Sequence, residues 1–477
     1  MIIINKFIEA SEIFSAYYAA SYIILYLFLA IVSWVAIKRY FNSKFFLLKE
    51  VLVKSNHIIG VSIVAPAFNE ETTIVYNVKS LLFQEYPKFE VIIVNDGSTD
   101  STLELLIQEF SLVKVDFFYL EKIPTQLVRG HYKSSNPIYS KLLVVDKING
   151  KSKADASNAG INSAKYALFL CTDVDCILRK DTIAMLVKPF IENTVKVIAT
   201  GAAIRISNSC EFKDGMLYKS HFPDNFFARF QELEYIRSFL FGRMAWSKLN
   251  GLLLVSGGLG MFDKETAIEA GGYWHKSLGE DMELITRMRK LMHEKKEKFL
   301  ILYIPESLCW TEVPSSMTVF LRQRVRWARG LVQTLYLHKN LFFNPKYGIT
   351  GLVIFPYYLF FEFAVPVLEV IGLSVLIIDF LFFDINYNFL FIASFFVYLF
   401  YITITLVSIF LDQLIYKHYS GIKEVIILII MVFIEPFVFH PLNVFASIKG
   451  YWHFLKQKEQ KWGVMTRRGF NNPKQQL

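Results

Sequence analysis

Charged residues are scarce in this chain of 477 residues: Asp, Glu, Lys and Arg make up 19% of it, whereas apolar residues make up 54%. A typical soluble domain contains about 25% charged and about 45–50% apolar residues. This composition excludes a disordered chain and a wholly soluble protein. The charged residues that are present also exclude a chain that lies wholly in lipid. The positions of the apolar residues therefore indicate which parts of the chain lie in a membrane.

Cysteine is also rare, and this excludes a disulfide scaffold. Cys171, Cys176, Cys210 and Cys309 follow no metal-binding spacing, so we expect free thiols. The net charge is +9, but the sequence contains no motif typical of DNA or RNA recognition. We therefore expect no nucleic-acid partner and assign the excess Lys and Arg to cytoplasmic loops of a membrane protein.

Long apolar stretches lie on both sides of the central part of the chain. Residues 17–37 are apolar, and Lys38 and Arg39 follow at once. About 20 apolar residues span the hydrocarbon core of a bilayer, and the basic flank places the residues after it in the cytoplasm. Three further stretches cover residues 351–383, 389–411 and 425–445.

The first and third of these C-terminal stretches contain prolines and ionisable side chains. In a membrane span such residues face protein, water or a bend. We expect Glu362, Glu369, Glu435 and His440 to face a channel, with packing between helices as the alternative.

The tail creates a conflict of topology. Residues 451–477 contain six basic residues and one acidic residue, so we expect a cytoplasmic tail. Three crossings after a cytoplasmic domain would place it outside. Either one stretch is re-entrant or interfacial, or residues 351–383 or 425–445 form a broken pair of helices.

Residues 40–340 have short apolar runs interrupted by Gly, Pro, Asn and Asp, which is typical of an α/β domain. Residues 61–65 and 91–94 are predicted strands, and the helical segment 72–84 lies between them, so a βαβ unit with parallel strands is expected. Residues 166–171 form a third predicted strand.

Polar loops follow all three predicted strands. They carry Asn69, Glu70, Asp96, Asp173 and Asp175. Ligands of open α/β sheets bind beyond the carboxyl ends of the strands, and two carboxylates separated by one residue suit Mg²⁺ or Mn²⁺. Taken alone, Asp96 in NDGST is equally typical of a turn and a helix cap.

Two further segments carry charged side chains. Lys153 is able to neutralise phosphate, although a solvated helix face is the alternative. Glu280 and Asp281, taken alone, are typical of an acidic helix start that complements the helix dipole. Gly257 and Gly258 permit close approach of backbone to a ligand.

Residues 322–327 combine basic side chains with tryptophan. Gln323, Arg326 and Trp327 share one helical face. A guanidinium binds diphosphate well, and an indole ring stacks on sugars. The alternative is an amphipathic helix on the membrane surface, and we expect both roles to hold.

Six motifs occur in order: PAFNE, VNDGSTDST, GKSKADASNAG, DVD, GED and QRVRW. In this ordered set, over roughly residues 55–335, the chain resembles the membrane-embedded processive family 2 glycosyltransferases, which include cellulose, hyaluronan and poly-N-acetylglucosamine synthases. The resemblance implies a GT-A domain, a Rossmann-like α/β fold with a mostly parallel sheet, inserted between N- and C-terminal transmembrane helices.

The resemblance implies that Asn69, Glu70 and Asp96 hold the uridine of a UDP-sugar, with Lys153 and Asn158 near its uracil or diphosphate.

It also implies a metal and an acceptor site. Asp173 would contact the nucleotide sugar and, with Asp175, hold Mg²⁺ or Mn²⁺, and Asp281 would be the general base, with Glu280 beside it. The residues implied at the acceptor or diphosphate are Gln323, Arg324, Arg326 and Trp327.

We therefore expect a metal-dependent, processive, inverting β-glycosyltransferase that makes an exopolysaccharide and passes it through its own helices. The expected parts are a transmembrane helix (1–39), a cytoplasmic GT-A domain (40–340) with an interfacial helix near 317–338, channel helices (341–450) and a basic cytoplasmic tail (451–477). This layout implies a multi-pass protein of the plasma membrane. Its partners would be a UDP-sugar, the growing polysaccharide and the bilayer, and a small accessory membrane subunit stays open.

Two alternatives remain. A non-processive enzyme would transfer one sugar to polyprenyl phosphate or another lipid, and a membrane scaffold would keep the fold without the chemistry.

Overall fold

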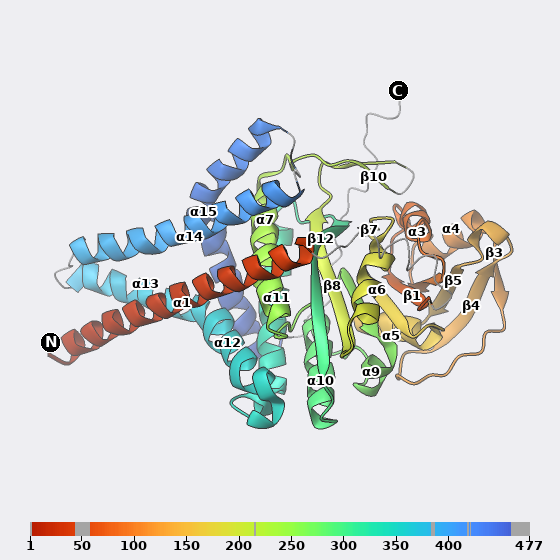
Figure 1. Ribbon diagram of the computed structural model, residues 1–477, viewed down its shortest axis with the longest axis horizontal. Coiled ribbons are helices and arrows are strands. Elements are labelled where there is room, and N and C mark those ends of the chain that lie inside the picture. Colours follow the sequence, from red (N-terminus) through yellow and green to blue (C-terminus); the bar gives the residue numbers. More distant parts are fainter. Residues whose placement is uncertain are drawn as a thin grey trace.

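The computed structural model describes residues 2–42, 58–213, 216–382, 387–416, 419 and 421–458. Most of the predicted basic tail, residues 459–477, lies outside the described residues. A ten-stranded sheet occupies one side of the molecule and a group of long helices the other (Figure 1).

The sheet has the strand order β3-β4-β5-β2-β1-β6-β11-β8-β12-β7. The bounds are β1 Val61–Ala67, β2 Phe89–Asn95, β3 Leu112–Val115, β4 Val128–Ser134, β5 Leu142–Lys147, β6 Leu168–Thr172, β7 Ile177–Leu178, β8 Lys196–Ile206, β11 Leu259–Asp263 and β12 Phe299–Thr311. A separate antiparallel pair consists of β9 Glu211–Lys213 and β10 Met216–Lys219.

The predicted βαβ unit is confirmed. Strand β1 pairs in parallel with β2 on one side and with β6 on the other, so the carboxyl ends of all three strands lie at one edge of the sheet. Strand β2 also pairs in parallel with β5. All residues of β2, β5 and β6 are buried, because helices cover both faces, and this explains their continuous apolar runs.

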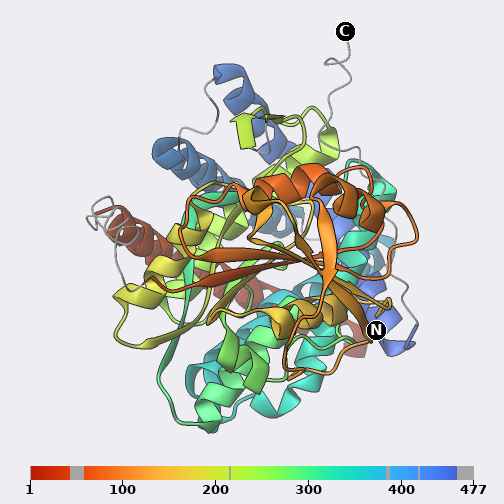
Figure 2. The same ribbon diagram turned by 90° about the vertical axis from the view of Figure 1, so that its right-hand side faces the viewer.

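Helices cover the two faces of the sheet (Figure 2). Those close to the sheet are α3 Ile74–Leu82, α4 Thr102–Glu109, α5 Lys153–Ser163, α6 Thr182–Glu192, α9 Lys264–Glu269 and α10 Glu280–Glu294. The predicted helix at 72–84 is therefore shorter, at 74–82. Helices α7 Phe226–Arg237 and α11 Met317–Leu337 lie between the sheet and the long helices (Figure 1), and α8 Met244–Lys248 packs beside α1.

Four segments are long and apolar enough to cross a membrane: Ile13–Asn42, Thr350–Phe382, Leu390–Tyr416 and Ile422–Leu455. They correspond to the four predicted apolar stretches, which are confirmed as helices of suitable length and composition. The helices that contain them are α1 Ile2–Asn42, α13 Ala364–Phe382, α14 Tyr387–Tyr416 and α15 Ile422–Leu455.

The second of these segments is divided. Its first part consists of the π-helical turns η5 Thr350–Ile354 and η6 Tyr358–Phe363 on either side of α12 Phe355–Tyr357. Phe355 and Tyr357 are buried in the core that continues from the sheet. This part is therefore anchored to the α/β domain, and only α13 extends away from it.

Candidate active site

The loops after β1 and β2 hold each other in place. The side-chain oxygen of Asn69 accepts a hydrogen bond from the Thr99 backbone at 2.8 Å, and the Glu70 N–H donates to Thr102 Oγ1 at 2.9 Å. Asn69 adopts a φ of 56°, which asparagine tolerates better than most residues. The structure thus makes Asn69 a part of the loop framework that presents Asp96.

Asp96 lies at the end of β2 in a buried charge network. Its Oδ1 accepts hydrogen bonds from Lys147 Nζ at 2.7 Å and from the Gly150 N–H at 3.0 Å. Lys147, at the end of β5, has no exposed surface and also contacts Asp155 Oδ2 at 2.5 Å. Burial raises the pKa of the Asp96 carboxyl, and the hydrogen bond from Lys147 opposes this rise.

Lys147 is a site residue that the sequence analysis missed. The available signal was a single lysine after Leu142–Asp146, a run that belongs to a fully buried strand. A buried lysine needs an acidic partner, and the neighbouring strand end supplies one in Asp96.

Helix α5 connects this network to the loop after β6. The Ser152 side chain caps the helix by accepting a hydrogen bond from the Asp155 N–H at 3.3 Å. From the first turn, Lys153 Nζ reaches Asp173 Oδ1 at 2.5 Å and donates to the Gly257 carbonyl at 2.8 Å. Burial disfavours the charged amine, but the Asp173 carboxylate outweighs it and raises the pKa of Lys153, so the amine remains a cation.

Asn158 has a different environment from the one predicted. Its amide nitrogen donates to the Tyr273 carbonyl at 2.7 Å, and its amide oxygen accepts from the Tyr273 N–H at 2.8 Å. Five residues separate it from Lys153, which is about 140° around a helix, so the two side chains face different directions. Asn158 therefore anchors the segment before α10, and we no longer assign it to the donor.

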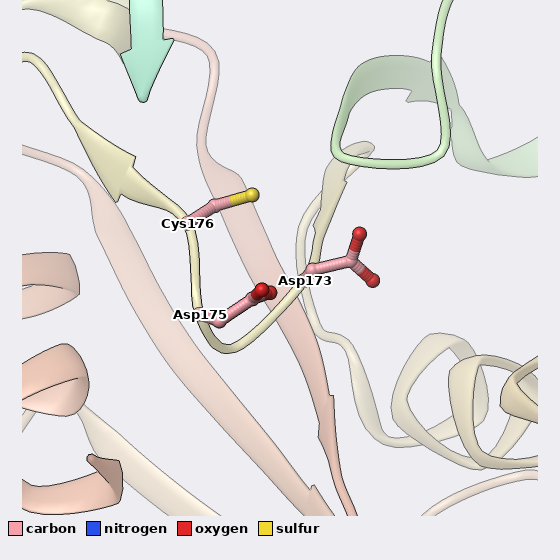
Figure 3. Close-up of side chains that lie close together, drawn as sticks. All are labelled: Asp173, Asp175 and Cys176. Atoms are coloured by element: carbon pink, nitrogen blue, oxygen red, sulfur yellow. The ribbon is translucent and has the colours of Figure 1, made fainter. Parts of the chain in front are cut away.

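The loop after β6 gathers three possible metal ligands (Figure 3). Carboxylate oxygens of Asp173 and Asp175 and the sulfur of Cys176 all lie within 4.8 Å of one another. The two carboxylates fit a divalent cation such as Mg²⁺ or Mn²⁺, and the sulfur adds a softer donor. The four cysteines are free, as predicted, but the place of Cys176 beside the carboxylates was missed.

The glycine loop before β11 brings this group next to Asp281. A side-chain carbon at Gly257 would lie 3.3 Å from Asp281 Oδ2 and 3.5 Å from Lys153 Nζ. A side-chain carbon at Gly258 would lie 3.6 Å from Asp173 Oδ2. Asp173, Lys153 and Asp281 therefore surround one short stretch of backbone that carries no side chains.

Helix α10 begins at the predicted catalytic pair. Asp281 Oδ1 accepts a hydrogen bond from the Met282 N–H at 2.9 Å. Glu280 is buried, and burial, followed by the charge of Asp281, raises the pKa of its carboxyl. The start of α10 also packs on α11, because a side-chain carbon at Gly330 would lie 2.8 Å from the Gly279 nitrogen.

Helix α11 presents the predicted acceptor residues beside α10. Arg326 lies close enough to Glu280 to lower the pKa of that carboxyl, against the effect of burial. Trp327 has 38% of its surface exposed, so part of its ring is open to a ligand. Gln323 Oε1 is buried and accepts no hydrogen bond from the residues that the structure describes.

Arg324 contacts the Trp327 ring, with its guanidinium 4.3 Å from the ring centroid, and is paired with a carboxylate of another helix. Both of its terminal nitrogens lie 2.6 Å from the carboxylate oxygens of Glu234 on α7. The predicted contact with acceptor or diphosphate is thus replaced by an ion pair between helices, since residues 324 and 326 face different sides of α11.

The ionisable residues of the C-terminal stretches are mostly paired. Glu435 is buried and accepts from Arg237 of α7 at 3.0 Å, which favours helix packing over a channel position. Glu369 and His440 face each other at 3.0 Å. Glu362 accepts from the Tyr357 hydroxyl at 2.8 Å.

Two family models match this part of the chain. The model described as glycosyl transferase family 2 matches residues 62–120, and the model described as glycosyltransferase like family 2 matches residues 136–330. The chain belongs to the family 2 glycosyltransferases. These ranges contain the predicted donor, metal, catalytic and acceptor residues.

Among curated proteins, this family 2 glycosyltransferase is similar to poly-β-1,6-N-acetyl-D-glucosamine synthases. The Staphylococcus epidermidis protein is 30% identical over 283 residues, covering 59% of this chain and 57% of that protein. The protein of Staphylococcus aureus strain COL is 26% identical over 302 residues, covering 62% and 61%. The match thus spans about three fifths of the length of these relatives.

A solved structure confirms the GT-A fold. A mannosyltransferase from Pyrobaculum calidifontis, in complex with GDP-Man and Mn²⁺, superposes with a TM-score of 0.51 at 16% identity. The superposition covers 90% of this chain and 100% of that chain.

Proposed function

We propose that this family 2 glycosyltransferase is a processive, inverting enzyme that extends a polysaccharide from a UDP-sugar. The similarity to poly-β-1,6-N-acetyl-D-glucosamine synthases supports UDP-N-acetylglucosamine as the donor and a β-1,6-linked polymer as the product. The observation that carries the proposal is the packing of α11, with Trp327, on the start of α10, with Asp281.

The donor half of the proposed site lies on the strand-end loops. Asp96, held by Lys147, takes the uridine, and Lys153 supplies positive charge for the diphosphate. Asp173 and Asp175, with Cys176 beside them, would hold a divalent cation, which stabilises the negative charge of a departing diphosphate when bound. The Mn²⁺ in the related mannosyltransferase supports such a site.

Asp281 acts as the general base. Its carboxylate takes the proton of the acceptor hydroxyl as the hydroxyl oxygen forms a bond to the anomeric carbon. The bond from that carbon to the diphosphate breaks at the same time, and UDP leaves with the electron pair. Attack from the side opposite the leaving group inverts the anomeric centre. Gly257 leaves room for this approach, because any side chain there would meet Asp281 Oδ2.

Trp327 provides the acceptor platform. Its exposed indole suits stacking on the terminal sugar of the polymer. Because this platform lies beside the base, the end of the extended polymer binds in the same site for the next transfer. The apolar helices support a multi-pass protein of the plasma membrane. Its GT-A domain lies in the cytoplasm, where nucleotide sugars are made. The polymer passes between the apolar helices.

The test uses the full chain purified into lipid nanodiscs. Radiolabelled UDP-N-acetylglucosamine, UDP-glucose, UDP-galactose and UDP-glucuronate are supplied in parallel, and the product is sized and its linkage determined. We expect a long β-1,6-linked polymer from UDP-N-acetylglucosamine alone. A lipid carrying one sugar would establish the non-processive alternative, and UDP binding without any transfer would favour the scaffold.

A further inference from the structure

Helix α15 runs in a different direction from the other long apolar helices. Helices α1, α13 and α14 extend side by side away from the α/β domain, whereas α15 runs across their direction (Figures 1 and 2). The distal half of α14 leaves the domain, as exposed Phe391 and Phe396 show, while its other half contacts α7 through Thr405.

Helix α15 remains in contact with the domain along its length. Just before its start, the Tyr419 hydroxyl donates to Glu232 of α7 at 2.8 Å. Near its middle, Glu435 pairs with Arg237 of α7 at 3.0 Å. Close to its end, a side-chain carbon at Gly450 would lie 2.8 Å from the Val325 carbonyl of α11.

These contacts argue against a crossing of the bilayer by α15. A helix of 34 residues is about 51 Å long at 1.5 Å per residue. If it spanned the ~30 Å hydrocarbon core, one end would lie far from α7 and α11. Neither α7 nor α11 is able to follow it into lipid, because they carry Arg237 and Arg324 among other charges.

The surface of α15 has two apolar faces with different neighbours. The face toward α7 and α11 buries Leu428, Met431, Val432, Glu435 and Phe439. The opposite face exposes large apolar side chains spaced three or four residues apart: Ile422, Ile426, Ile430, Phe433 and Phe437. An exposed stripe of this length needs an apolar medium.

We infer that α15 lies along the cytoplasmic interface of the membrane, with its exposed stripe against lipid chains, and that only α1, α13 and α14 cross. Three crossings place the tail on the same side as the GT-A domain. Four crossings would place it outside, in conflict with the basic composition of the tail, and this conflict is removed. Trp452 is exposed, with Lys456 Nζ 4.6 Å from its ring centroid, and such a pair is typical of the headgroup region.

The inference rests on the proposed membrane insertion of α1, α13 and α14 and is independent of the transfer chemistry. The first test fuses alkaline phosphatase or green fluorescent protein to the end of the full chain in a bacterial host. We expect an inactive phosphatase and a fluorescent reporter, because both report a cytoplasmic tail. An active phosphatase with a dark fluorescent reporter would mean an even number of crossings and would overturn the inference.

The second test measures depth in the bilayer. Single cysteines replace Ile426, Phe433 and Phe445 on α15, are labelled with bimane in nanodiscs, and are quenched by lipids with spin labels near the headgroup or near the chain end. The matched control uses Phe391, Phe396 and Phe410 on α14, which are also exposed apolar residues. The parent protein without an added cysteine reports labelling of the native thiols.

We expect headgroup-proximal quenching at all three α15 positions and a change of depth along α14. Deep quenching at Phe433 between two shallow positions would show that α15 crosses and would overturn the inference. Shallow quenching along α14 as well would show that the membrane insertion is wrong. Sugar transfer, assayed on the same samples, separates these outcomes from a failure of the proposed function.

Discussion

Arg324 and Glu234 form a bidentate ion pair, with both nitrogen–oxygen distances at 2.6 Å, that joins α11 to α7. The same guanidinium lies 4.3 Å from the centroid of the Trp327 ring. The orientation of the proposed acceptor platform is thus set by a residue on another helix. Because α7 also contacts α14 and α15 through Arg237, the platform is connected to the apolar helices.

We expect Glu234→Gln to shorten the polymer while leaving UDP binding unchanged, because the substitution releases Arg324 from below Trp327. Loss of one partner of a well-buried pair costs about 3–5 kcal/mol, and the partial exposure of Glu234 reduces that cost, so the protein should still fold. Product sizing and UDP titration measure the effect. The control is Glu109→Gln, which removes an exposed pair with Lys79; equal shortening in both variants would contradict the role.

Asp281→Asn should lower transfer by about 10²–10⁴-fold, the usual contribution of a general base. The amide cannot take a proton, but it keeps the shape of the side chain. UDP affinity, measured by calorimetry, should remain within a few-fold of the original value. Glu265→Gln, on the exposed surface of α9, is the control. Full activity of Asp281→Asn would remove Asp281 as the base.

Chelation with EDTA should stop turnover, and Mg²⁺ or Mn²⁺ should restore it. Asp175→Asn should raise the concentration of Mn²⁺ needed for half-maximal activity by at least about tenfold, because it removes a charged oxygen ligand. Cys176→Ser should change it much less, since the carboxylates carry most of the affinity for these ions. Activity that persists unchanged in EDTA would contradict the metal site.

Removal of Lys147 should weaken UDP binding through Asp96. In Lys147→Gln/Asp155→Asn, one positive and one negative charge are lost together, so the network keeps its net charge while Asp96 loses its cation. We expect UDP affinity to fall at least about tenfold, since the pair fixes the carboxylate, with little change in kcat at saturating donor. Lys188→Met, at another buried lysine, is the control for burial alone.

A second comparison separates positioning by Lys147 from a general loss of stability. In an Asp96→Asn background, the same two substitutions should change UDP affinity less than about twofold, because coupled residues give non-additive effects. If the losses of UDP affinity instead multiplied, Lys147 would act on the stability of the fold rather than through Asp96.

Much of this architecture follows from neighbouring residues. Apolar runs predicted the strands β1, β2 and β6 and the four long helices, because burial on both faces of a sheet, or transfer into lipid, selects apolar residues locally. The polar loops after those strands were also predicted correctly as one edge, because parallel pairing brings their carboxyl ends together.

Local sequence patterns did not predict the contacts between segments that are distant in the chain. Asn158 and Arg324 have the residue types expected of ligand-binding side chains, yet Tyr273 and Glu234 occupy them. The places of Lys147 beside Asp96 and of Cys176 beside the carboxylates were not predictable, because a single lysine or cysteine gains meaning only from the groups packed around it.

Composition and motif order were therefore sufficient to establish an α/β transferase with apolar helices at both ends. The tertiary arrangement alone distinguished ligand-facing from framework side chains and set the direction of α15. The physical reason is distance along the chain: Arg324 and Glu234 are 90 residues apart, and Tyr419 and Glu232 are 187 apart. Whether residues so far apart pair depends on the whole fold, whereas the hydropathy of a segment depends only on its own residues.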